Sequence, residues 1–478
     1  MSTLINTHVS EARSVSRVWL EGEKLFHGGL EIGMRFMMNP SKDLHRVELR
    51  PAPDDYAGKT FTVSKRTRNG RTYPLIEIRD AILAEIFEIG SKIRIAIQKG
   101  RLVLTRSQVA MRVAERVKRF NDKMKSGEPL STLSCFHGGG VLDKALHKGL
   151  AKAGVSSYVK LAVEMESEYI DSSLRNNPEL WREDSTVVTG DIRELNVMGA
   201  SIPQCDLAWA GVPCTGASKS GVSKLQLSCA EEHEGAGSMF YYFLDLVRAM
   251  NPAICLIENV KEYLNTASMT VIRQVLTALG YELSIKVVSG FEMGSLEKRD
   301  RMCLVATTPG ACLPVDFDQL KPIREREAQL SDVLEDVPES SESWKPYSYL
   351  ADKEVRDKKA GKGFARQLLT GEEDGCGVIG RGYAKARSTE PFIVAKHNPE
   401  LSRLLTVREH ARVKTIPESM VEGLSDTKAH EVLGQSVIFT VFEAVGELIG
   451  RTIRGLSAPS KPAENFDQTG MRQLSMTA

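Results

Sequence analysis

The stretch Gly211-Val-Pro-Cys-Thr-Gly-Ala-Ser218 directly follows a short apolar segment, Cys205–Ala210. That segment is typical of a buried strand, and Gly211 and Pro213 end it. Cys214 is therefore expected at a strand end, in front of a loop of small residues. A thiolate placed there can act as a nucleophile, but a free cysteine is more often a small, inert, buried residue. The stretch alone leaves both interpretations open, and the rest of the chain has to decide between them.

The bulk composition limits the classes of protein to consider. A chain of 478 residues with 42% hydrophobic and 26% charged residues is long enough for two or three globular domains. It contains no apolar run long enough to cross a bilayer and no charged-then-apolar leader, so we expect no membrane and a cytoplasmic location. Its eight cysteines include no CxxC pair, which argues against a structural zinc site, and we expect no metal.

The charge is distributed unevenly along the chain. The net charge is +1, yet residues 1–125 carry an excess of about ten positive charges and the remainder an excess of about nine negative ones. A basic module joined to a near-neutral or acidic body suggests a polyanionic partner for that module. The alternative is a basic face that is merely solvated.

The amino-terminal part contains an apparent internal repeat. Three pairs of segments match: Val18–Leu20 with Ile76–Ile78, Leu30–Phe36 with Phe87–Ile93, and His45–Leu49 with Arg101–Leu104. Each copy predicts a strand, a short helix, a glycine turn and two further strands. A single copy is too small to bury a core, but two copies could close into one small barrel over residues 1–106. Residues 107–129 then predict an amphipathic linker helix.

This repeat pattern resembles the swapped-hairpin barrels of AbrB-like and SymE-like regulators, many of which bind DNA. The resemblance implies that the domain pairs with itself or binds DNA. Within it, the run Lys65–Arg71 is either a basic hairpin tip suited to phosphate or an ordinary solvated turn.

From Leu130 onward, strands and helices alternate, which predicts a parallel sheet. The first strand, Ser131–Phe136, runs into His137-Gly-Gly-Gly140, the next ends in Glu164, and the third ends in Asp191. Open α/β sheets bind ligands at this carboxyl edge. The two acids suit a ligand with hydroxyl groups and an exocyclic amine, such as an adenosine. The lack of a GxxxxGK[ST] loop argues against a triphosphate.

Further charged residues follow the strand that leads to Cys214. The fifth strand, Ala253–Ile257, ends in Glu258, so a carboxylate is expected one strand along from the thiol. Read alone, Glu258 would more often be an acid at a helix start, favoured there by the helix dipole. Arg299 and Arg301, two apart in an extended segment, should point the same way and hold a polar ring edge or a phosphate. A solvated charge run is the alternative.

Taken in order, these segments resemble the DNA cytosine-5 methyltransferase family over about residues 130–455. The matching motifs are Phe136-His-Gly-Gly-Gly140, Glu164, Gly190-Asp-Ile192, Gly211-Val-Pro-Cys214, Glu258-Asn-Val260, Arg299-Asp-Arg301, Arg403–Arg412 and Gly434-Gln-Ser-Val437. The chain departs from the family pattern at five positions: Val141, Val212, Thr215, Glu297 and Gln435. None of these departures removes a catalytic group.

The resemblance implies an α/β fold of the class I S-adenosylmethionine-dependent methyltransferases, with a Rossmann-like mixed sheet. It implies a catalytic domain over residues 130–307 that is completed by residues 401–456, and a target recognition domain over residues 308–400. Residues 457–478 are polar and predict a disordered tail. The small β-barrel-like domain precedes all of these.

The resemblance also assigns roles. The implied catalytic residues are Cys214, Glu258, Arg299 and Arg301. Cys214 would attack carbon 6 of a cytosine flipped out of duplex DNA. A protonated Glu258 would neutralise the negative charge that develops at ring N3, and the two arginines would hold the O2 edge of the base. S-adenosylmethionine is the implied cofactor. Its implied binding residues are Phe136, Gly138, Gly140, Glu164, Met165, Asp191, Ile192, Pro213, Ser436 and Val437.

Two other functions remain open. An RNA cytosine-5 methyltransferase would use the same chemistry, although the long interval 308–400 favours a reader of double-stranded DNA. A DNA-binding regulator with a vestigial catalytic half is the other possibility, and the intact Cys214, Glu258 and Arg301 argue against it. The catalytic unit is expected to be monomeric. The sequence identifies neither the recognition site nor a companion nuclease.

Overall fold

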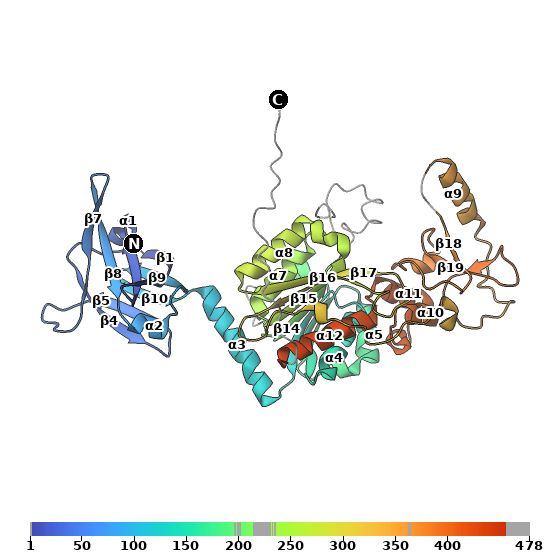
Figure 1. Cartoon of the computed structure of the whole chain (residues 1–478), viewed down its shortest axis with the longest axis horizontal. Helices are drawn as coiled ribbons and strands as arrows, with labels where there is room; N and C mark the ends of the chain where they lie inside the picture. Colours follow the sequence, from blue (N-terminus) through green and yellow to red (C-terminus); the bar gives the residue numbers. More distant parts are fainter. Residues whose placement is uncertain are drawn as a thin grey trace, which may run out of the picture. The chain divides into compact units, whose positions relative to one another are not determined.

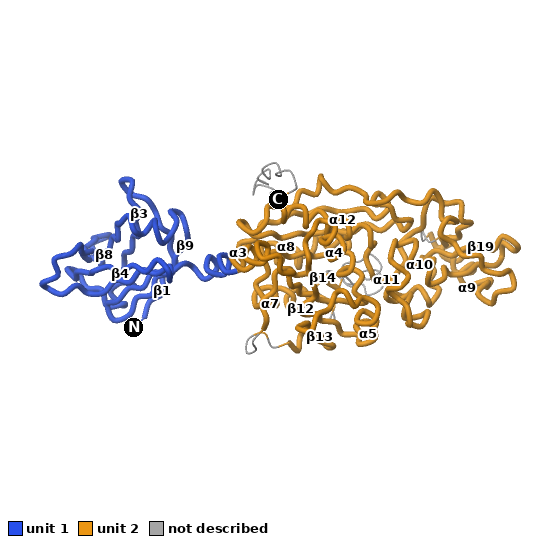
Figure 2. The backbone as a smooth tube through the Cα atoms, turned by 90° about the horizontal axis from the view of Figure 1, so that it is seen from below, with its two compact units in different colours: residues 1–115 blue, residues 116–478 orange. Residues whose placement is uncertain are grey.

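The computed structural model describes residues 2–195, 197, 202–213, 231, 233, 236–361 and 365–455. The chain forms two compact units, Met1–Glu115 and Arg116–Ala478, which Figure 2 shows in different colours. The boundary falls within helix α3 (Gln108–Ser126), in the stretch for which the sequence predicts a linker helix. Each unit has its own hydrophobic core. The predicted tail at 457–478 lies outside the described residues.

Unit 1 contains both copies of the predicted repeat. The first copy consists of β3 (Val15–Glu21), α1 (Glu23–His27), β4 (Arg35–Ser41) and β5 (Arg46–Pro51). The second consists of β8 (Arg71–Arg79), α2 (Ile82–Ile86), β9 (Lys92–Gln98) and β10 (Arg101–Arg106). In β9 the apolar residues Ile93, Ile95 and Ile97 are buried, while Lys92 and Arg94 are exposed. This alternation is what a half-buried strand requires.

The strands of unit 1 form two sheets around one core. Four further strands complete them: β1 (Ser2–His8), β2 (Ser10–Ala12), β6 (Phe61–Thr62) and β7 (Ser64–Arg68). One sheet has the order β1-β9-β10-β5-β4-β6 and the other the order β2-β3-β8-β7. The two copies meet through the β10–β5 and β3–β8 pairs. The packing is therefore barrel-like, but the described strands make two ladders where the sequence suggests a single closed barrel.

The larger sheet of unit 2 has the order β13-β12-β11-β14-β15-β17-β16 (Figure 1). Its strands are β11 (Leu130–Cys135), β12 (Ser157–Glu164), β13 (Thr186–Thr189), β14 (Leu207–Gly211), β15 (Ile254–Val260), β16 (Glu282–Ser289) and β17 (Asp300–Thr307). The first five strands of this order pair in parallel, whereas β17 is antiparallel to both of its neighbours. This is the predicted mixed sheet.

Both faces of this sheet are covered, because the central strands are apolar on both sides. In β14, Leu207 and Trp209 enter one core, and Ala208 and Ala210 enter the other. The first core contains α4 (Val141–Lys152), α5 (Ser167–Asn176) and α12 (Phe439–Ile453). The second contains α7 (Met239–Met250) and α8 (Ala267–Ala278). Near-continuous apolar strands are typical of sheets buried on both faces.

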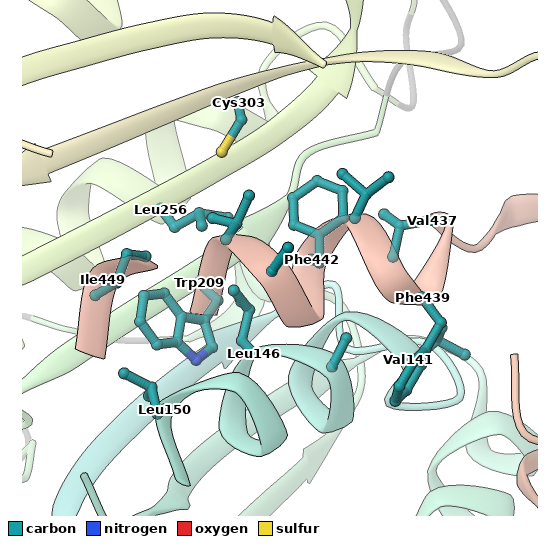
Figure 3. Packing of buried hydrophobic residues seen from close by; sticks show 14 of the residues in the cluster. Val141, Leu146, Leu150, Trp209, Leu256, Cys303, Val437, Phe439, Phe442 and Ile449 are labelled. Carbon is teal, nitrogen blue, oxygen red and sulfur yellow. The ribbon is translucent and has the colours of Figure 1, made fainter. Parts of the chain in front are cut away.

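The final helix returns to the sheet, as the sequence predicts. Figure 3 shows Phe439, Phe442 and Ile449 of α12 packed with residues of α4 and with Trp209. Glycines allow the two helices to approach closely. A Cβ atom at Gly149 would clash with the backbone of α12, and one at Gly446 would clash with the backbone of α4.

Residues 308–400 contain little regular structure, in line with the loss of the α/β rhythm in the sequence. The elements there and just beyond are α9 (Ser348–Lys359), β18 (Gln367–Leu369), β19 (Pro391–Val394), β20 (Ser402–Arg403), α10 (Val407–Val413) and α11 (Asp426–Gln435). Strands β18, β19 and β20 form a small sheet, and a separate apolar cluster that includes Leu330, Ile379 and Tyr383 packs near it.

Short 3-10 helices connect the larger elements. They are η1 (Pro178–Leu180), η2 (Ile192–Glu194), η4 (Lys261–Asn265), η5 (Phe317–Gln319), η6 (Leu330–Asp332), η7 (Tyr383–Lys385) and η8 (Glu418–Val421). In the described part of the chain no single helix is long and apolar enough to cross a membrane, although the bent pair α11 and α12 passes that test together by length and composition.

Candidate functional site

Most of the residues predicted to form the site lie along one edge of the large sheet. Phe136 follows β11, Glu164 ends β12, Asp191 follows β13 and Pro213 follows β14. Because these strands are parallel, their carboxyl ends meet at the same edge. Glu258 lies beside Gly211 in the register of β15 and β14. Cys214 itself lies outside the described residues, directly after Pro213.

The turn after β11 depends on its glycines. Phe136, Gly138 and Gly140 all have positive φ angles of 58° to 77°, a region that glycine enters easily and other residues rarely do. A Cβ atom at Gly140 would also lie 2.5 Å from Ser173 Oγ. The turn therefore brings backbone close to the sheet edge, at the start of α4.

A buried histidine supports this turn, and the sequence analysis does not identify it. The Nδ1 atom of His137 lies 2.9 Å from Ser134 Oγ and 3.1 Å from Asp143 Oδ2, and its Nε2 atom lies 2.8 Å from Ser173 Oγ. Ser134 also donates a 2.7 Å hydrogen bond to Asp143. These contacts join β11, α4 and α5 beneath the glycine turn. The only signal in the sequence is the position of His137 inside the glycine motif.

Glu164 is hydrogen-bonded to the glycine turn. Its Oε2 atom accepts the backbone N–H of Gly138 at 2.7 Å, and its Oε1 atom accepts those of Met165 at 2.9 Å and Glu166 at 3.0 Å. Three backbone donors thus fix the orientation of the carboxylate. The Met165 side chain is 69% exposed beside it. The structure therefore brings together an oriented acid, an exposed thioether and a glycine turn.

Asp191 and Ile192 are placed differently from each other. The carboxylate of Asp191 accepts hydrogen bonds from the backbone N–H of Arg193 at 2.9 Å and from its guanidinium at 2.5 to 3.0 Å. The hydrogen bonds from Arg193 lower the pKa of Asp191 below its usual range. Ile192 is buried in the core that contains α7 and α8. Asp191 thus remains an anion at this edge of the sheet, and Ile192 contributes packing.

The residues after α11 lie close to the same turn. The Nε2 atom of Gln435 lies 3.5 Å from where a Cβ of Gly138 would be. The hydroxyl of Ser436 donates to the carbonyl oxygen of Val432 at 2.5 Å, and Val437 is buried in the core at the start of α12 (Figure 3). Of the predicted pair, Ser436 caps α11 and Val437 packs in the core.

Glu258 lies inside a longer strand than the sequence indicates. The sequence ends this strand at Ile257, whereas β15 continues to Val260 because it pairs with β17 as far as Arg301. The Oε1 atom of Glu258 lies 2.9 Å from Arg301 Nε. Its Oε2 atom lies 3.5 Å from where a Cβ of Gly211 would be. The carboxylate is thus held beside the strand that leads to Cys214.

Burial raises the pKa of the Glu258 carboxyl above its usual range. The positive charges of Arg301, Arg299 and Lys414 act in the opposite direction, but burial prevails. A carboxyl with a raised pKa holds its proton at higher pH than an exposed one. Glu258 is thus suited to donate a proton or a hydrogen bond, which a general acid must do.

Asn259 connects β15 to the end of β14. Its side-chain amide donates to the carbonyl oxygen of Val212 at 3.0 Å, and its side-chain oxygen accepts the N–H of Val260 at 2.8 Å. Asn259 is buried, so both hydrogen bonds are shielded from water. They fix the backbone two residues before Cys214.

The two predicted arginines bind different partners. Arg301 contacts Glu258, whereas Arg299 is buried and donates to Glu297 Oε1 at 3.0 Å and to the carbonyl oxygens of Ile379 and Gly434 at 3.3 and 3.2 Å. That Arg299 and Arg301 together hold the O2 edge of the cytosine stays a prediction. The structure places Arg301 at the acid and Arg299 in a neighbouring buried network.

That network contains a second residue that the sequence analysis does not identify. The Nζ atom of Lys414 lies 3.2 Å from Glu297 Oε2, and neither side chain is exposed. The sequence signal is indirect: Glu297 is one of the departures from the family pattern, and a buried carboxylate needs a cation.

The segment Arg403–Arg412 ties the interval 308–400 to α10. Arg403 forms a two-pronged pair with Glu409 at 2.6 and 2.8 Å, and Glu409 also accepts the backbone N–H of Glu335 at 2.7 Å. Thr406 and Glu409 form a capping box at the start of α10. Within the described ranges, no group of three or more His, Cys, Asp and Glu side chains is placed to hold a metal ion.

Comparisons with known proteins agree with this geometry. The family model described as C-5 cytosine-specific DNA methylase matches residues 133–451, so unit 1 lies outside the match. The chain is 30% identical over 267 residues to the type II methyltransferase M.DsaV of Dactylococcopsis salina, covering 54% of this chain and 72% of that protein. It is 29% identical over 278 residues to the type II methyltransferase M.NlaX of Neisseria lactamica, covering 56% and 83%.

Two solved structures share the fold. The S. pombe Dnmt2 methyltransferase matches with a TM-score of 0.52 at 18% identity, over 69% of this chain and all of that one. The Entamoeba histolytica methyltransferase EhMeth matches with a TM-score of 0.54 at 16% identity, over 67% and 98%. At these identities the likeness concerns the fold alone.

Proposed function

Because the chain belongs to the C-5 cytosine-specific DNA methylase family, we propose that it methylates carbon 5 of a flipped-out cytosine in duplex DNA through a covalent intermediate on Cys214. The family makes it a DNA cytosine-5 methyltransferase. The observation that carries the detailed proposal is the contact of Glu258 with Arg301 beside Gly211, three residues before Cys214.

The reaction has to overcome the low nucleophilicity of cytosine carbon 5. The thiolate of Cys214 adds to carbon 6 and forms a carbon–sulfur bond, and the displaced electron pair moves toward ring N3. Glu258, in its acid form, donates a proton to N3, so the ring becomes an enamine that is nucleophilic at carbon 5. After methylation a base removes the carbon 5 proton, N3 returns its proton to Glu258, and the sulfur leaves as the thiolate to restore the ring. Cys214 is thus regenerated.

Each oxygen of Glu258 has a separate part in this proposal. Oε1 contacts Arg301, which holds the carboxyl group in one orientation. We assign the proton for N3 to Oε2, the oxygen on the Gly211 side. The raised pKa of Glu258 supports this assignment, because the acid form has to be present at neutral pH.

The residues at the first three strand ends fit S-adenosylmethionine. This cofactor supplies an electrophilic methyl group when bound. The oriented carboxylate of Glu164 suits two ribose hydroxyl groups, Asp191 suits an exocyclic amine, and Met165 and Phe136 offer apolar contacts at the same edge. The glycine turn brings backbone N–H groups near the start of α4, where a carboxylate is favoured.

We assign the reading of the DNA sequence to residues 308–400. Their position beside Arg299, through the hydrogen bonds of Ile379, supports a link between recognition and the acid site. The flipping of the base follows from chemistry, since carbon 6 cannot be attacked inside a stacked duplex. A bacterial cytoplasmic location and a monomeric catalytic unit stay predictions.

Methyl transfer from tritiated cofactor to duplex DNA tests the proposal. The wild type should label DNA and Cys214→Ala should not, while Cys312→Ala, at a buried cysteine away from the edge, should retain labelling. Labelling of RNA alone would favour an RNA methyltransferase. DNA binding without any labelling would favour a regulator with a vestigial catalytic half.

For unit 1 we propose a second DNA-binding surface on the sheet β2-β3-β8-β7. Residues 1–115 contain 19 Lys and Arg against 13 Asp and Glu. In β3, Val18 and Leu20 face the core, so Arg17, Trp19 and Glu21 face outward. This outer face has a concavity of about 510 Å³, which is lined by Trp19, Thr62, Ser64, Lys65, Arg66, Leu75 and Glu77.

The arginines of this face are held in place. The guanidinium carbons of Arg17 and Arg66 lie 5.3 and 5.5 Å from the centre of the Trp19 ring. Glu21 pairs with Arg66 at 3.2 Å and with Arg68 at 2.9 Å. Guanidinium groups held by stacking and ion pairs lose less freedom when they bind phosphate. The arrangement supports contacts with the DNA backbone.

Fluorescence anisotropy of the full chain on labelled duplex DNA tests this surface. Replacing Arg66, Arg68 and Arg71 with Ala should weaken binding and lower the slope of log affinity against log salt by roughly one for each lost phosphate contact. Replacing Lys92, Arg94 and Lys99, which lie on the other sheet or its turn, removes the same charge as a control. Equal effects of the two triple variants would contradict a specific surface. A change in sedimentation alone would indicate self-pairing instead.

A further inference from the structure

A buried cluster of charges lies next to the catalytic acid. Glu297 contacts Lys414 through Oε2 at 3.2 Å, and through Oε1 it accepts from Arg299 at 3.0 Å and from the backbone N–H of Ile379 at 3.2 Å. The side chains of Glu297 and Lys414 are fully buried, and that of Arg299 is 5% exposed. The cluster is close enough to Glu258 for Lys414 and Arg299 to lower the pKa of that acid.

The members of this cluster depend on one another. A buried charge without a partner is strongly unfavourable, whereas a buried pair is tolerated. When Glu258 holds the proton that the reaction needs, Glu297 is the anion that faces Arg299 and Lys414. Burial and the charge of Arg299 lower the pKa of Lys414 to about 7. The ammonium group is therefore retained near neutral pH chiefly because Glu297 is present.

The cluster also joins segments that are far apart in the sequence. Residues 296–298 pair with Cys376 through two backbone hydrogen bonds, Cys376 N–H to Leu296 at 2.8 Å and Lys298 N–H to Cys376 at 2.9 Å. Lys414 ends α10, and its carbonyl oxygen accepts the N–H of Phe439 at the start of α12. One ion pair thus connects the interval 308–400, the segment that leads into β17, and the helices α10 and α12.

We propose that Lys414 is a positioning residue of the methyl-transfer reaction: its ammonium group neutralises Glu297, and through Glu297 and Arg299 it holds residues 376–380 against the strand that carries Arg301. The proposal rests on the assigned reaction, because Arg301 orients Glu258 in that reaction. Lys414 acts through its neighbours and does not contact the cytosine. As a result, the interval 308–400, to which we assign DNA recognition, keeps a fixed position relative to Glu258.

Several titratable groups surround the two residues whose charge matters. Those that face Lys414 are Glu297, Arg299, Arg301, Cys376 and His410, with His430 stacked on His410. Those that face Glu258 are Arg301, Arg299, Lys414 and Cys303. The arginines keep their charge across the accessible pH range, and the buried cysteines have pKa values raised by burial. Lys414 and Glu297 are therefore the members to vary.

Three variants test whether Lys414 and Glu297 act through their ion pair or individually. They are Lys414→Gln, Glu297→Gln and the double variant. Lys414→Gln takes one cation from buried Glu297, which keeps Arg299, and Glu297→Gln takes the anion from buried Arg299 and Lys414. In both variants kcat should therefore fall about tenfold or more and Tm should drop. The double variant replaces two charges with two amides that can bond to each other, and both quantities should return to within about threefold and a few degrees of the wild type. The surface pair of half-buried Lys428 and exposed Glu168, varied in the same way, is the control and should show no effect.

The pH profile of kcat distinguishes positioning from mere stability. Activity falls at alkaline pH as Glu258 loses its proton. Removing the Lys414 charge should shift this limb to higher pH, because that charge lowers the pKa of Glu258. Glu297→Gln should move the limb less, because the loss of Glu297 also removes the ammonium charge of Lys414. A general structural defect would lower kcat in Lys414→Gln without moving the limb.

Each outcome decides a different question. If the wild type transfers no methyl group to DNA, the assigned reaction fails. If the wild type is active but the double variant is no better than the single ones, or Lys414→Gln leaves the alkaline limb in place, the role of Lys414 is overturned. Single variants that do not fold beside a double variant that does would support the pairing. A double variant that also fails to fold would overturn it.

Discussion

The side-chain amide of Asn259 donates a hydrogen bond of 3.0 Å to the carbonyl oxygen of Val212. Asn259 is the next-to-last residue of a seven-residue strand, and Val212 directly follows the neighbouring strand. The bond therefore links the strand that carries the acid to the backbone that leads to Cys214. In the proposed reaction the thiol and the acid act on the same base, so their separation has to be fixed.

Asn259→Ala should slow methyl transfer by about tenfold or more, since it removes this link and leaves a buried carbonyl without its donor. The loss should appear in kcat, because the residue is buried and is not expected to contact DNA. Steady-state kinetics with tritiated cofactor measure it. Asn265→Ala, at the exposed last residue of η4, is the control. A change confined to KM for DNA would contradict the assigned role.

Glu164→Ala should weaken cofactor binding, because the carboxylate that the glycine turn orients would be lost. A buried or half-buried charged hydrogen bond contributes about 1.5–3 kcal/mol, so the Kd for S-adenosylmethionine should rise by about tenfold or more. Isothermal titration calorimetry without DNA measures this directly. Glu166→Ala, two residues along and facing Arg381, should leave the Kd nearly unchanged. Equal Kd values for the wild type and Glu164→Ala would show that this edge does not bind the ribose.

Acid should destabilise the protein through its stacked histidines. His410 and His430 share a 2.9 Å contact between their Nδ1 atoms, and burial lowers the pKa of His430 to about 4 and that of His410 well below its usual value. The unfolded chain binds these protons near pH 6.5, so the free energy of unfolding falls as the pH drops from about 6.5 toward 4. At about pH 5, one such histidine lowers the free energy of unfolding by roughly 2 kcal/mol.

The Tm of His430→Gln should therefore decrease less than that of the wild type when the pH is lowered from about 7.5 to about 5. The exposed His397→Gln should behave like the wild type. Differential scanning calorimetry at the two pH values gives the comparison. The same Tm loss in all three proteins would mean that the histidine pair does not control the acid response.

The sequence predicts the strand ends well, because apolar runs and glycine breaks are local signals. Glu164, Asp191 and Glu258 all lie at the predicted edge. It does not predict that β15 continues past Glu258, since that extension comes from pairing with β17, a strand some forty residues further along the chain. The general rule that carboxyl ends of parallel strands meet was sufficient for the site but not for the length of its strands.

Side-chain partners are the part that local patterns cannot predict. Arg299 and Arg301 are two apart and extended, which suggests a common target, yet Arg299 binds Glu297 and Arg301 binds Glu258. The partners of His137 come from three separate elements, and that of Lys414 is more than a hundred residues away. Such contacts arise from tertiary packing. The single sequence hint is the acid at Glu297, where the family pattern has an amide.

The proposed reaction depends on a covalent bond between Cys214 and the cytosine. Mass spectrometry can detect this bond after the protein is incubated with cofactor and duplex DNA that contains 5-fluorocytosine. Fluorine at carbon 5 cannot leave as a proton does, so the reaction stops with the sulfur still bound to carbon 6. The wild type should form a denaturation-resistant adduct in which a peptide containing Cys214 carries the nucleotide, and Cys214→Ala should form none. An adduct on another residue, or an active enzyme that forms no adduct, would contradict the proposed role of Cys214.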